Sequence, residues 1–249
     1  MKIVIAGGTG LIGKALIDAY AGEHEIIVLS RRQADLPGAR IVLWDAETIG
    51  DWVIELRDAD VLINLAGAGI FGDGWMPKRW TTQRKTLILK SRVKSVRVLS
   101  EALQAQERPI TWVQASAIGW YGPRDESPVD ETGSAGDDFL AQVCIALEKE
   151  IRVDPRIVRT VVVRFGVVLS EQAGAFPLLA LPFRFVGGGP MGGGAQIVSW
   201  IHIDDVVSAI GTLMEAGDAS GVFNLTAPNA VSNRALNQLL GKQTRRLGF

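Results

Sequence analysis

The sequence predicts an α/β protein built on a parallel sheet, and three observations lead to this fold class. Apolar runs of strand length alternate with longer stretches of helical periodicity, which is typical of parallel strands joined by crossover helices. Most of these runs are too apolar to have one face in water. A glycine-rich turn connects the first run to the first helical stretch. With 249 residues, 47% of them hydrophobic, the chain can form one sizeable core, so we expect a single domain.

The expected strands are short apolar runs separated by more polar stretches. The first of them opens the chain and leads directly into the glycine-rich turn. In order, the six runs are KIVIA (2–6), EIIVLS (25–30), RIVLW (40–44), DVLINLA (60–66), ITWVQAS (110–116) and RTVVVRF (159–165).

Helices are expected where apolar residues recur at spacings of three and four. These stretches fall at about 11–21, 81–106, 137–152, 204–216 and 233–240. A short polar side chain at the start of a helix accepts a hydrogen bond from a free backbone N–H. We therefore expect Asp204 or Asp205 to cap the fourth helix, and Ser232 or Asn233 to cap the fifth.

Charge and cysteine content narrow the class of function. The 26 basic and 27 acidic side chains are interspersed and give a formal net charge of -1, so there is no basic stripe for nucleic acid and no polybasic membrane anchor. The one cysteine cannot form an internal disulfide, and the chain starts without the long apolar run of a signal peptide or membrane span. We expect a cytoplasmic protein whose partner is a small molecule, with no nucleic acid and no membrane involved.

The sharpest motif is AGGTGLIG, which lies between the first strand and the first helix. Gly7, Gly10 and Gly13 have the spacing of a dinucleotide-binding turn. The first glycine permits the tight turn, the second lets the backbone approach a pyrophosphate, and the third lets the helix pack on the strand. The N–H groups at the helix start face the anion, so Thr9, Leu11 and Ile12 are expected to bind the cofactor with the three glycines.

The end of the second strand indicates which dinucleotide is bound. Proteins that prefer NAD usually place an acid there for the ribose hydroxyls, but this chain has Ser30, Arg31 and Arg32. A hydroxyl and two guanidinium groups suit a 2′-phosphate. This favours NADP(H) as the cofactor; the alternative is that the two arginines only solvate a loop.

The motifs together resemble an atypical, epimerase-like subfamily of the extended short-chain dehydrogenases/reductases, whose substrate is unsettled. The resemblance runs from residue 1 to about 235 through GGTGLIG, INLAGAGI, RWTTQRKTLILKSRV, SAIGWYG, DFLAQVCIALEKE, VVVRFGVVLS and GGGAQIVSWIHIDD. It implies a Rossmann-type, doubly wound sheet with a small C-terminal substrate region formed after about residue 165. Members of the subfamily continue beyond the motif APNAVSN, so this lobe is expected to be shortened here.

The resemblance also implies several site residues. It places Asp45 near the adenine and Ser116 at the position of an active-site serine. It further suggests that the cofactor cleft is lined by Leu65, Ala66 and Gly67.

The Tyr-x-x-x-Lys pair that such proteins usually carry is missing. It falls on Leu140 and Cys144, neither of which can replace it. Together with Val143 and Leu147 they form an apolar helix face, so Cys144 is expected to pack in the interior and not to act as a nucleophile.

Tyr121 is a candidate substitute for the missing acid, with Ser116 helping to polarise a carbonyl. The alternative is that Tyr121 is a packed loop aromatic whose hydroxyl bonds to backbone. Of the other polar residues, we expect His202 to be structural, and Ser91 and Arg92 to lie on a solvated helix face. No metal-ligand spacing is present, so no metal is expected.

These observations predict an NADP(H)-dependent oxidoreductase or epimerase that acts on a small carbonyl or sugar-like substrate. The alternative, supported by the missing Tyr-x-x-x-Lys pair, is an NADP(H)-responsive binding or regulatory protein without turnover. A homodimer formed through the helices that begin near residues 81 and 137 is also expected from the resemblance.

Overall fold

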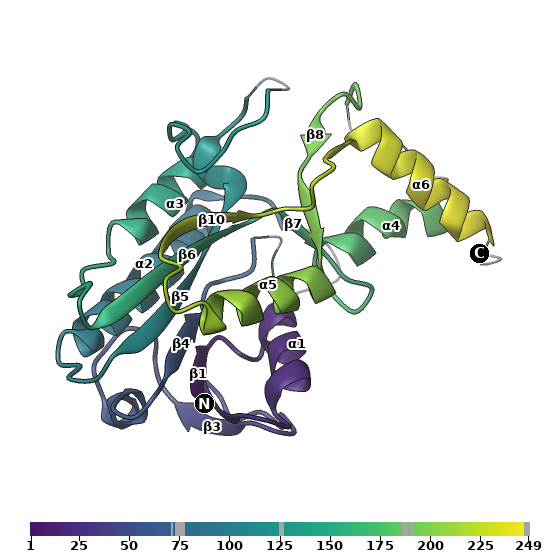
Figure 1. The fold of residues 1–249 in the computed structure, drawn as a ribbon. Coiled ribbons are helices and arrows are strands. Elements are labelled where there is room, and N and C mark those ends of the chain that lie inside the picture. Colours follow the sequence, from purple (N-terminus) through teal and green to yellow (C-terminus); the bar gives the residue numbers. More distant parts are fainter. Residues whose placement is uncertain (71, 73–77, 125–126, 186–188, 190–191, 247–249) are drawn as a thin grey trace.

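The predicted parallel sheet is confirmed. The computed structural model describes residues 1–70, 72, 78–124, 127–185, 189 and 192–246 (Figure 1). Its central sheet has seven strands in the order β10-β6-β5-β4-β1-β2-β3, and all neighbouring strands are parallel. The strands are β1 (Lys2–Ala6), β2 (Glu25–Ser30), β3 (Arg40–Leu43), β4 (Val61–Asn64), β5 (Ile110–Ala117), β6 (Val158–Phe165) and β10 (Gly221–Leu225).

Helices cover both faces of this sheet, as a doubly wound fold requires. On one side lie α2 (Thr82–Leu103) and α3 (Phe139–Glu148), and on the other lie α1 (Leu11–Tyr20) and α5 (Ile203–Glu215) (Figure 1). Alternate residues of β1 enter the two cores, because successive side chains of a strand point to opposite faces. Val4 packs in the core of α2 and α3, whereas Ile3 and Ile5 pack in that of α1 and α5.

The helix starts agree with the sequence at one predicted cap and differ at another. Ser232 Oγ accepts a hydrogen bond from Ala235 N at the start of α6 (Asn233–Arg246), as predicted. The prediction of Asp204 or Asp205 as the cap of α5 is wrong. The cap is His202, whose Nδ1 accepts from Asp204 N at 3.3 Å, because the helix starts directly after β9 (Trp200–His202). His202 is therefore structural, as expected.

The segments after the sixth strand form a smaller cluster beside the sheet. The helix α4 (Ala175–Phe185) packs on α6 through Ala180, Leu236 and Leu240 (Figure 1). Short strands complete this region: β7 (Val167–Leu169) pairs with β9, and β8 (Ile197–Val198) pairs with β11 (Val231–Ser232). The sequence did not predict α4, which carries Pro182 inside it, nor the short edge strand β10.

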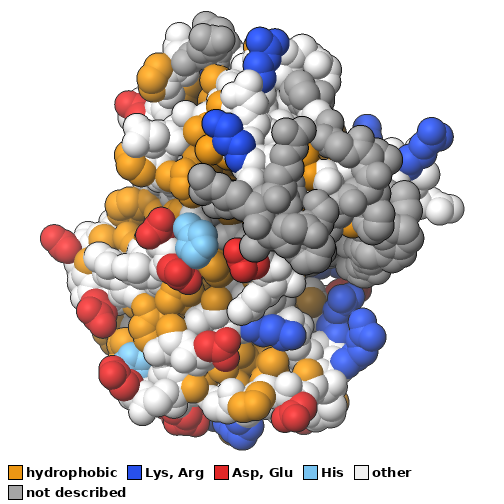
Figure 2. Space-filling view, turned by 90° about the vertical axis from the view of Figure 1, so that its right-hand side faces the viewer, with side chains coloured by type: hydrophobic (Ala, Val, Ile, Leu, Met, Phe, Trp, Pro, Cys, Tyr) orange, Lys and Arg blue, Asp and Glu red, His pale blue; other side chains and the backbone are white. Residues whose placement is uncertain are grey.

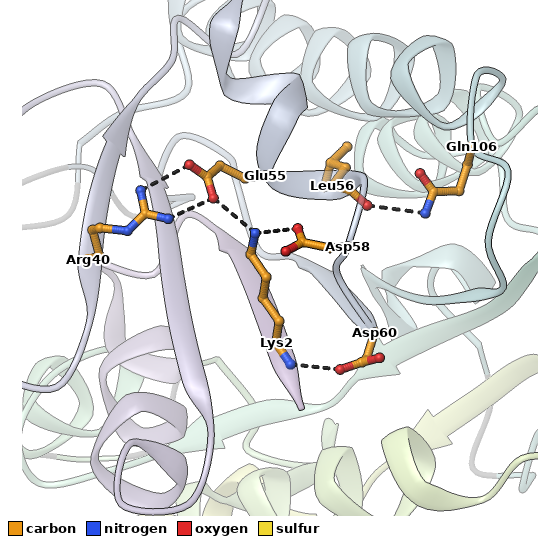
Figure 3. Close-up of polar contacts among 7 residues, drawn as sticks. All are labelled: Lys2, Arg40, Glu55, Leu56, Asp58, Asp60 and Gln106. Atoms are coloured by element: carbon orange, nitrogen blue, oxygen red, sulfur yellow. Dashed lines mark hydrogen bonds and ion pairs between the residues drawn. The ribbon is translucent and has the colours of Figure 1, made fainter.

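The amino-terminal edge of the sheet is closed by a polar cluster (Figure 3). Lys2 Nζ lies 2.5 Å from Asp58 Oδ1 and 3.1 Å from Glu55 Oε2, and Arg40 forms a two-point ion pair with Glu55. The 3-10 helix η1 (Asp51–Leu56) carries Glu55 into this cluster. Because the strands are parallel, this cluster lies at the opposite edge from the carboxyl ends, where α/β sheets bind their ligands.

One face of the molecule shows how charged side chains are distributed on the surface (Figure 2). On the face drawn in Figure 2, acidic and basic side chains are both present and are separated by hydrophobic and neutral surface. In the described residues, no helix is both long and apolar enough to span a bilayer. The predicted homodimer through α2 and α3 stays a prediction.

Candidate functional site

The glycine turn has the close contacts that its sequence predicted. Gly7 has a φ of +82°, and a Cβ added there would lie 2.9 Å from Ala66 N in the neighbouring loop. A Cβ on Gly13 would lie 2.4 Å from Gly8 Cα, so a side chain there cannot fit between α1 and the turn. Gly10 is the N-cap of α1 and offers no side chain to its first N–H groups. These donors are therefore left to a ligand at the end of the turn.

A first pocket, here called the β2-side pocket, has a volume of about 810 Å³ and lies over the carboxyl ends of β1 and β2. Residues from the glycine turn, the end of β2, the following loop and α2 line it. They include nearly all the predicted cofactor residues, namely Gly7, Thr9, Gly10, Ser30, Arg31, Arg32, Asp45, Leu65, Ala66 and Gly67. The structure thus brings together residues that are far apart in the sequence.

The turn after β2 presents two cations, Arg31 and Arg32, to this pocket. Ser30 Oγ donates to Arg32 O at 2.7 Å and accepts from Arg32 N at 3.3 Å, which fixes the turn. The side chains of Arg31 and Arg32 are exposed, and neither forms an ion pair within the described residues. Their charge is available to a phosphate.

Asp45 is held by its own loop on the far wall of the β2-side pocket. Its carboxylate accepts from Thr48 Oγ1 at 2.5 Å and from the backbone N–H groups of Glu47 and Thr48. These hydrogen bonds, that of the Thr48 hydroxyl foremost, hold the pKa of Asp45 below its usual value. The next residue, Ala46, has a φ of +65°, a conformation uncommon for a residue with a side chain and found often at binding sites.

A second pocket, the β5-side pocket, has a volume of about 610 Å³ and continues the first along the carboxyl edge of the sheet. Gly7, Gly10, Leu65 and Ala66 line both pockets, so the two form one cleft around the glycine turn. Leu11, Ile12 and Gly13 line only the second pocket. The cleft lies where the strand order reverses between β1 and β4, the position at which such sheets bind dinucleotides.

Ser116, at the end of β5, lines the β5-side pocket and begins a buried chain of polar contacts. Its hydroxyl donates to Glu148 Oε1 at 2.6 Å, because a carboxylate can only accept. Glu148 pairs with Arg164, with 2.8 Å between Arg164 Nη2 and Glu148 Oε2, and Arg164 Nε donates to Oε1 at 3.1 Å. Arg164 also lies 3.9 Å above the ring centre of Trp120. We call Ser116, Glu148, Arg164 and the groups bonded to Arg164 the Glu148 network.

Tyr121 is the far end of the Glu148 network. It lies in the 3-10 helix η2 (Ile118–Tyr121), and only 6% of it is exposed. Its hydroxyl accepts from Arg164 Nη1 at 3.0 Å and donates to Asn224 Oδ1 at 2.8 Å. Tyr121 lines neither pocket, so the structure connects it to Ser116 only through Arg164 and Glu148. Its hydroxyl bonds to side chains and not to backbone, which neither sequence interpretation foresaw.

Cys144 is buried, as the helical pattern predicted. Only 4% of it is exposed, its Sγ lies 3.7 Å from Ala117 O, and burial raises the pKa of its thiol. Leu140, Val143, Cys144 and Leu147 nevertheless all line the β5-side pocket. The residues at the usual Tyr-x-x-x-Lys positions thus form an apolar pocket wall.

Replacing Cys144 by alanine is expected to lower the free energy of unfolding by only about 1 kcal/mol, because a small buried group is lost. Cofactor affinity should stay unchanged, since no polar contact of the glycine turn involves the thiol. Urea unfolding and calorimetric titration with NADPH measure the two quantities. Rapid labelling of Cys144 by a thiol reagent in the folded protein would contradict its assignment as a buried, unreactive residue.

The expectation that Ser91 and Arg92 are solvated is wrong. Ser91 Oγ accepts from Ala68 N at 2.9 Å, and Arg92 Nη1 donates to Ala68 O at 2.9 Å. The loop after β4 folds over α2, so these two side chains contact protein and are only partly exposed. Helical spacing shows which residues share a face but does not show which loop covers it. No other sequence signal identified this contact.

The sheet order, the glycine turn and the cleft around it define a dinucleotide-binding protein of the Rossmann class. Among the described residues, no cluster of acidic, histidine and cysteine side chains could hold a metal ion. The chain belongs to the NAD dependent epimerase/dehydratase family, whose model matches residues 3–140.

Full-length relatives support this membership. The chain is 38% identical to the epimerase family protein YfhF of Bacillus subtilis over 252 aligned residues, which cover 99% of this chain and 80% of that protein. The structure of human epimerase family protein SDR39U1 (isoform 2) with NADPH aligns with a TM-score of 0.85 at 33% identity, over 97% of this chain and 79% of that one. A nucleoside-diphosphate sugar epimerase from Corynebacterium glutamicum aligns with a TM-score of 0.82 at 34% identity, over 98% of this chain and 50% of that chain.

Proposed function

We propose that the chain binds NADP(H) in the cleft and acts as an oxidoreductase or epimerase on a small carbonyl or sugar-like compound. The observation that carries this proposal is that the two pockets form one continuous cleft. Arg31 and Arg32 lie at one end of it, and the Ser116 hydroxyl, bonded to the Glu148 carboxylate, lies at the other. The human relative whose structure contains NADPH supports the choice of cofactor.

The residues of the cleft fit the parts of this cofactor. Ser30, Arg31 and Arg32 suit the 2′-phosphate, and Asp45 stands beside them on the adenine side. The pyrophosphate matches the free N–H groups at the start of α1, near Thr9, Leu11, Ile12 and Gly13. Leu65, Ala66 and Gly67 form the wall between the two halves. When bound, the cofactor supplies a hydride acceptor or, when reduced, a hydride donor.

Ser116 and Glu148 provide a route for the proton. The Ser116 proton lies toward Glu148, so the lone pairs of Ser116 Oγ remain to accept a hydrogen bond from a substrate hydroxyl. In the oxidative direction the substrate proton moves to Ser116 Oγ while the Ser116 proton moves to Glu148; reduction reverses both transfers. Arg164 and Tyr121 act further back, by holding Glu148 in place.

Calorimetric titration tests the cofactor assignment. NADPH is expected to bind at least about tenfold more tightly than NADH, equivalent to about 1.4 kcal/mol, a modest gain for two charge-assisted contacts. The Arg31→Ala/Arg32→Ala double variant should lose this preference, while Arg57→Ala, which removes an exposed cation that lines neither pocket, should keep it. Equal affinities for the two cofactors in the unmodified protein would exclude the assignment.

A second candidate function is an NADP(H)-responsive binding protein without turnover. The observation that favours it is the apolar pair Leu140 and Cys144 where the family's usual chemistry places tyrosine and lysine. Single-turnover oxidation of NADPH against a panel of carbonyl compounds separates the two functions. Oxidation with any member of the panel supports an enzyme, whereas tight binding of NADPH with no oxidation across the panel supports the binding protein.

A further inference from the structure

The β5-side pocket has an uneven distribution of charge. Among the described residues that line it, Arg92 is the only charged one, and no aspartate or glutamate is present. The other polar side chains in the lining are neutral, with Gln114 and Ser116 at the end of β5, and the remaining walls are mostly apolar. From the described lining, a ligand in this pocket therefore meets one positive charge and no negative one.

Within the described part of the chain, the hydrogen-bond partners that hold Arg92 at the pocket are neutral. Its Nη1 donates to Ala68 O at 2.9 Å and to Ile88 O at 3.2 Å. No carboxylate pairs with it in the part of the chain that the structure describes, and its Nε and Nη2 have no protein partner there. Burial lowers the pKa of Arg92, which reflects the loss of water around an uncompensated guanidinium.

The backbone is shaped to fit this side chain. A Cβ added at Gly67 would lie 3.0 Å from Arg92 Cγ and 3.0 Å from Arg92 Cζ, so the guanidinium packs directly on the glycine backbone. The two hydrogen bonds of Nη1 fix the plane of the group. Its unused edge keeps two donors in a rigid fork, the arrangement that matches the two oxygens of a carboxylate.

We propose that the compound taken by the β5-side pocket carries a carboxylate, which pairs with Arg92. The proposal rests on the function proposed above and narrows its substrate class to small carbonyl or hydroxy acids. A single negative charge balances the positive charge that Arg92 gives to the described lining. Ser116 lies on the same pocket and meets the reacting oxygen, so the acid group and the reacting carbon of the substrate are bound by different residues.

A matched pair of unreactive probes tests this proposal in the full chain saturated with NADP⁺. Cyclohexanecarboxylate and cyclohexanecarboxamide have nearly the same size and differ in charge. Calorimetric titration is expected to show that the acid binds at least about tenfold more tightly than the amide. Equal binding of the two probes, or tighter binding of cyclohexylphosphonate than of the carboxylate, would overturn the proposal.

Variants assign the effect to Arg92. In Arg92→Gln the affinity for the acid should fall to the affinity for the amide, and the affinity for the amide should stay the same. Arg92→Lys keeps the positive charge but loses the two parallel donors, so it should retain part of the preference for the acid. Lys85→Gln is the control, because Lys85 lies on the same helix, over the ring of Phe139, and lines neither pocket. A preference for the acid that survives in Arg92→Gln would overturn the assignment.

Two further readouts keep this inference separate from the proposed function. The acid and the amide are also titrated into the protein without cofactor. If the protein fails to bind NADP⁺, the proposed function is refuted, but the difference in affinity between the acid and the amide is still measured. If Arg92→Gln does not fold, the unmodified protein and Arg92→Lys decide the outcome. A loss of NADP⁺ affinity in Arg92→Lys without any preference for the acid in the unmodified protein would assign Arg92 to the cofactor instead.

Discussion

Replacing Arg164 by methionine is expected to lower the free energy of unfolding by about 3–5 kcal/mol, since it leaves the carboxylate of Glu148 buried without a counter-charge. The exposed fractions of the two side chains are 4% for Arg164 and 11% for Glu148. Burial by itself lowers the pKa of Arg164, but its hydrogen bonds with Glu148 and Tyr121 outweigh this and raise it. The guanidinium also stacks on Trp120, so the packing of that ring is lost as well.

Urea unfolding of two comparison variants distinguishes this mechanism from a general loss of an ion pair. Arg97→Met removes a two-point ion pair with Glu150 at the surface, where 62% of the arginine side chain is exposed, and should leave the unfolding midpoint nearly unchanged. The double variant Arg164→Met/Glu148→Met should recover part of the loss, because both charges are removed. This role of Arg164 would be contradicted if Arg164→Met were as stable as the unmodified protein, or if the double variant recovered none of the lost free energy of unfolding.

Ser116→Ala is expected to slow turnover by about 10² to 10⁴-fold, the usual contribution of a positioned proton-transfer group. Ser116 lines the β5-side pocket and its Oγ lies 2.6 Å from Glu148, so the variant removes the group that we propose as the link between the substrate oxygen and the carboxylate. NADPH affinity should stay nearly the same, because Ser116 does not line the β2-side pocket. Single-turnover oxidation of NADPH, with the best substrate from the carbonyl panel, gives the rate.

Tyr121→Phe is the matched comparison for Ser116→Ala. It removes one hydroxyl that bonds to Arg164 and Asn224 and lies outside both pockets, so the loss of rate should be clearly smaller than in Ser116→Ala. If Tyr121→Phe instead abolishes turnover and Ser116→Ala has no effect, then the phenol is the proton donor and the geometry described here is not the reacting one.

The fold could be predicted well from the sequence, because the strands β1, β2, β4 and β6 are apolar runs that are buried on both faces. Ile3, Val4 and Ile5 show this directly, since neighbours in the chain enter opposite cores. The glycine turn could be predicted equally well, because Gly7 and Gly13 occur where a side chain has no space. At Gly13 the space is taken by Gly8 of the same turn, and at Gly7 by the adjacent loop at Ala66. Strand β10 and helix α4 were missed because Gly221 and Asn224 interrupt the apolar residues of β10, and because Pro182 lies inside α4.

The sheet, the dinucleotide turn and the apolar place of Cys144 could thus be predicted without the structure, because they follow from local spacing and from the burial of apolar strands. Which polar groups gather at the β5-side pocket depends on how distant elements pack. Ser116, Glu148 and Arg164 meet although they come from β5, α3 and β6, and Arg92 reaches its pocket because the loop after β4 folds over α2. Such contacts could not be predicted, because hydrogen bonds and ion pairs between distant segments leave no periodic pattern in the sequence.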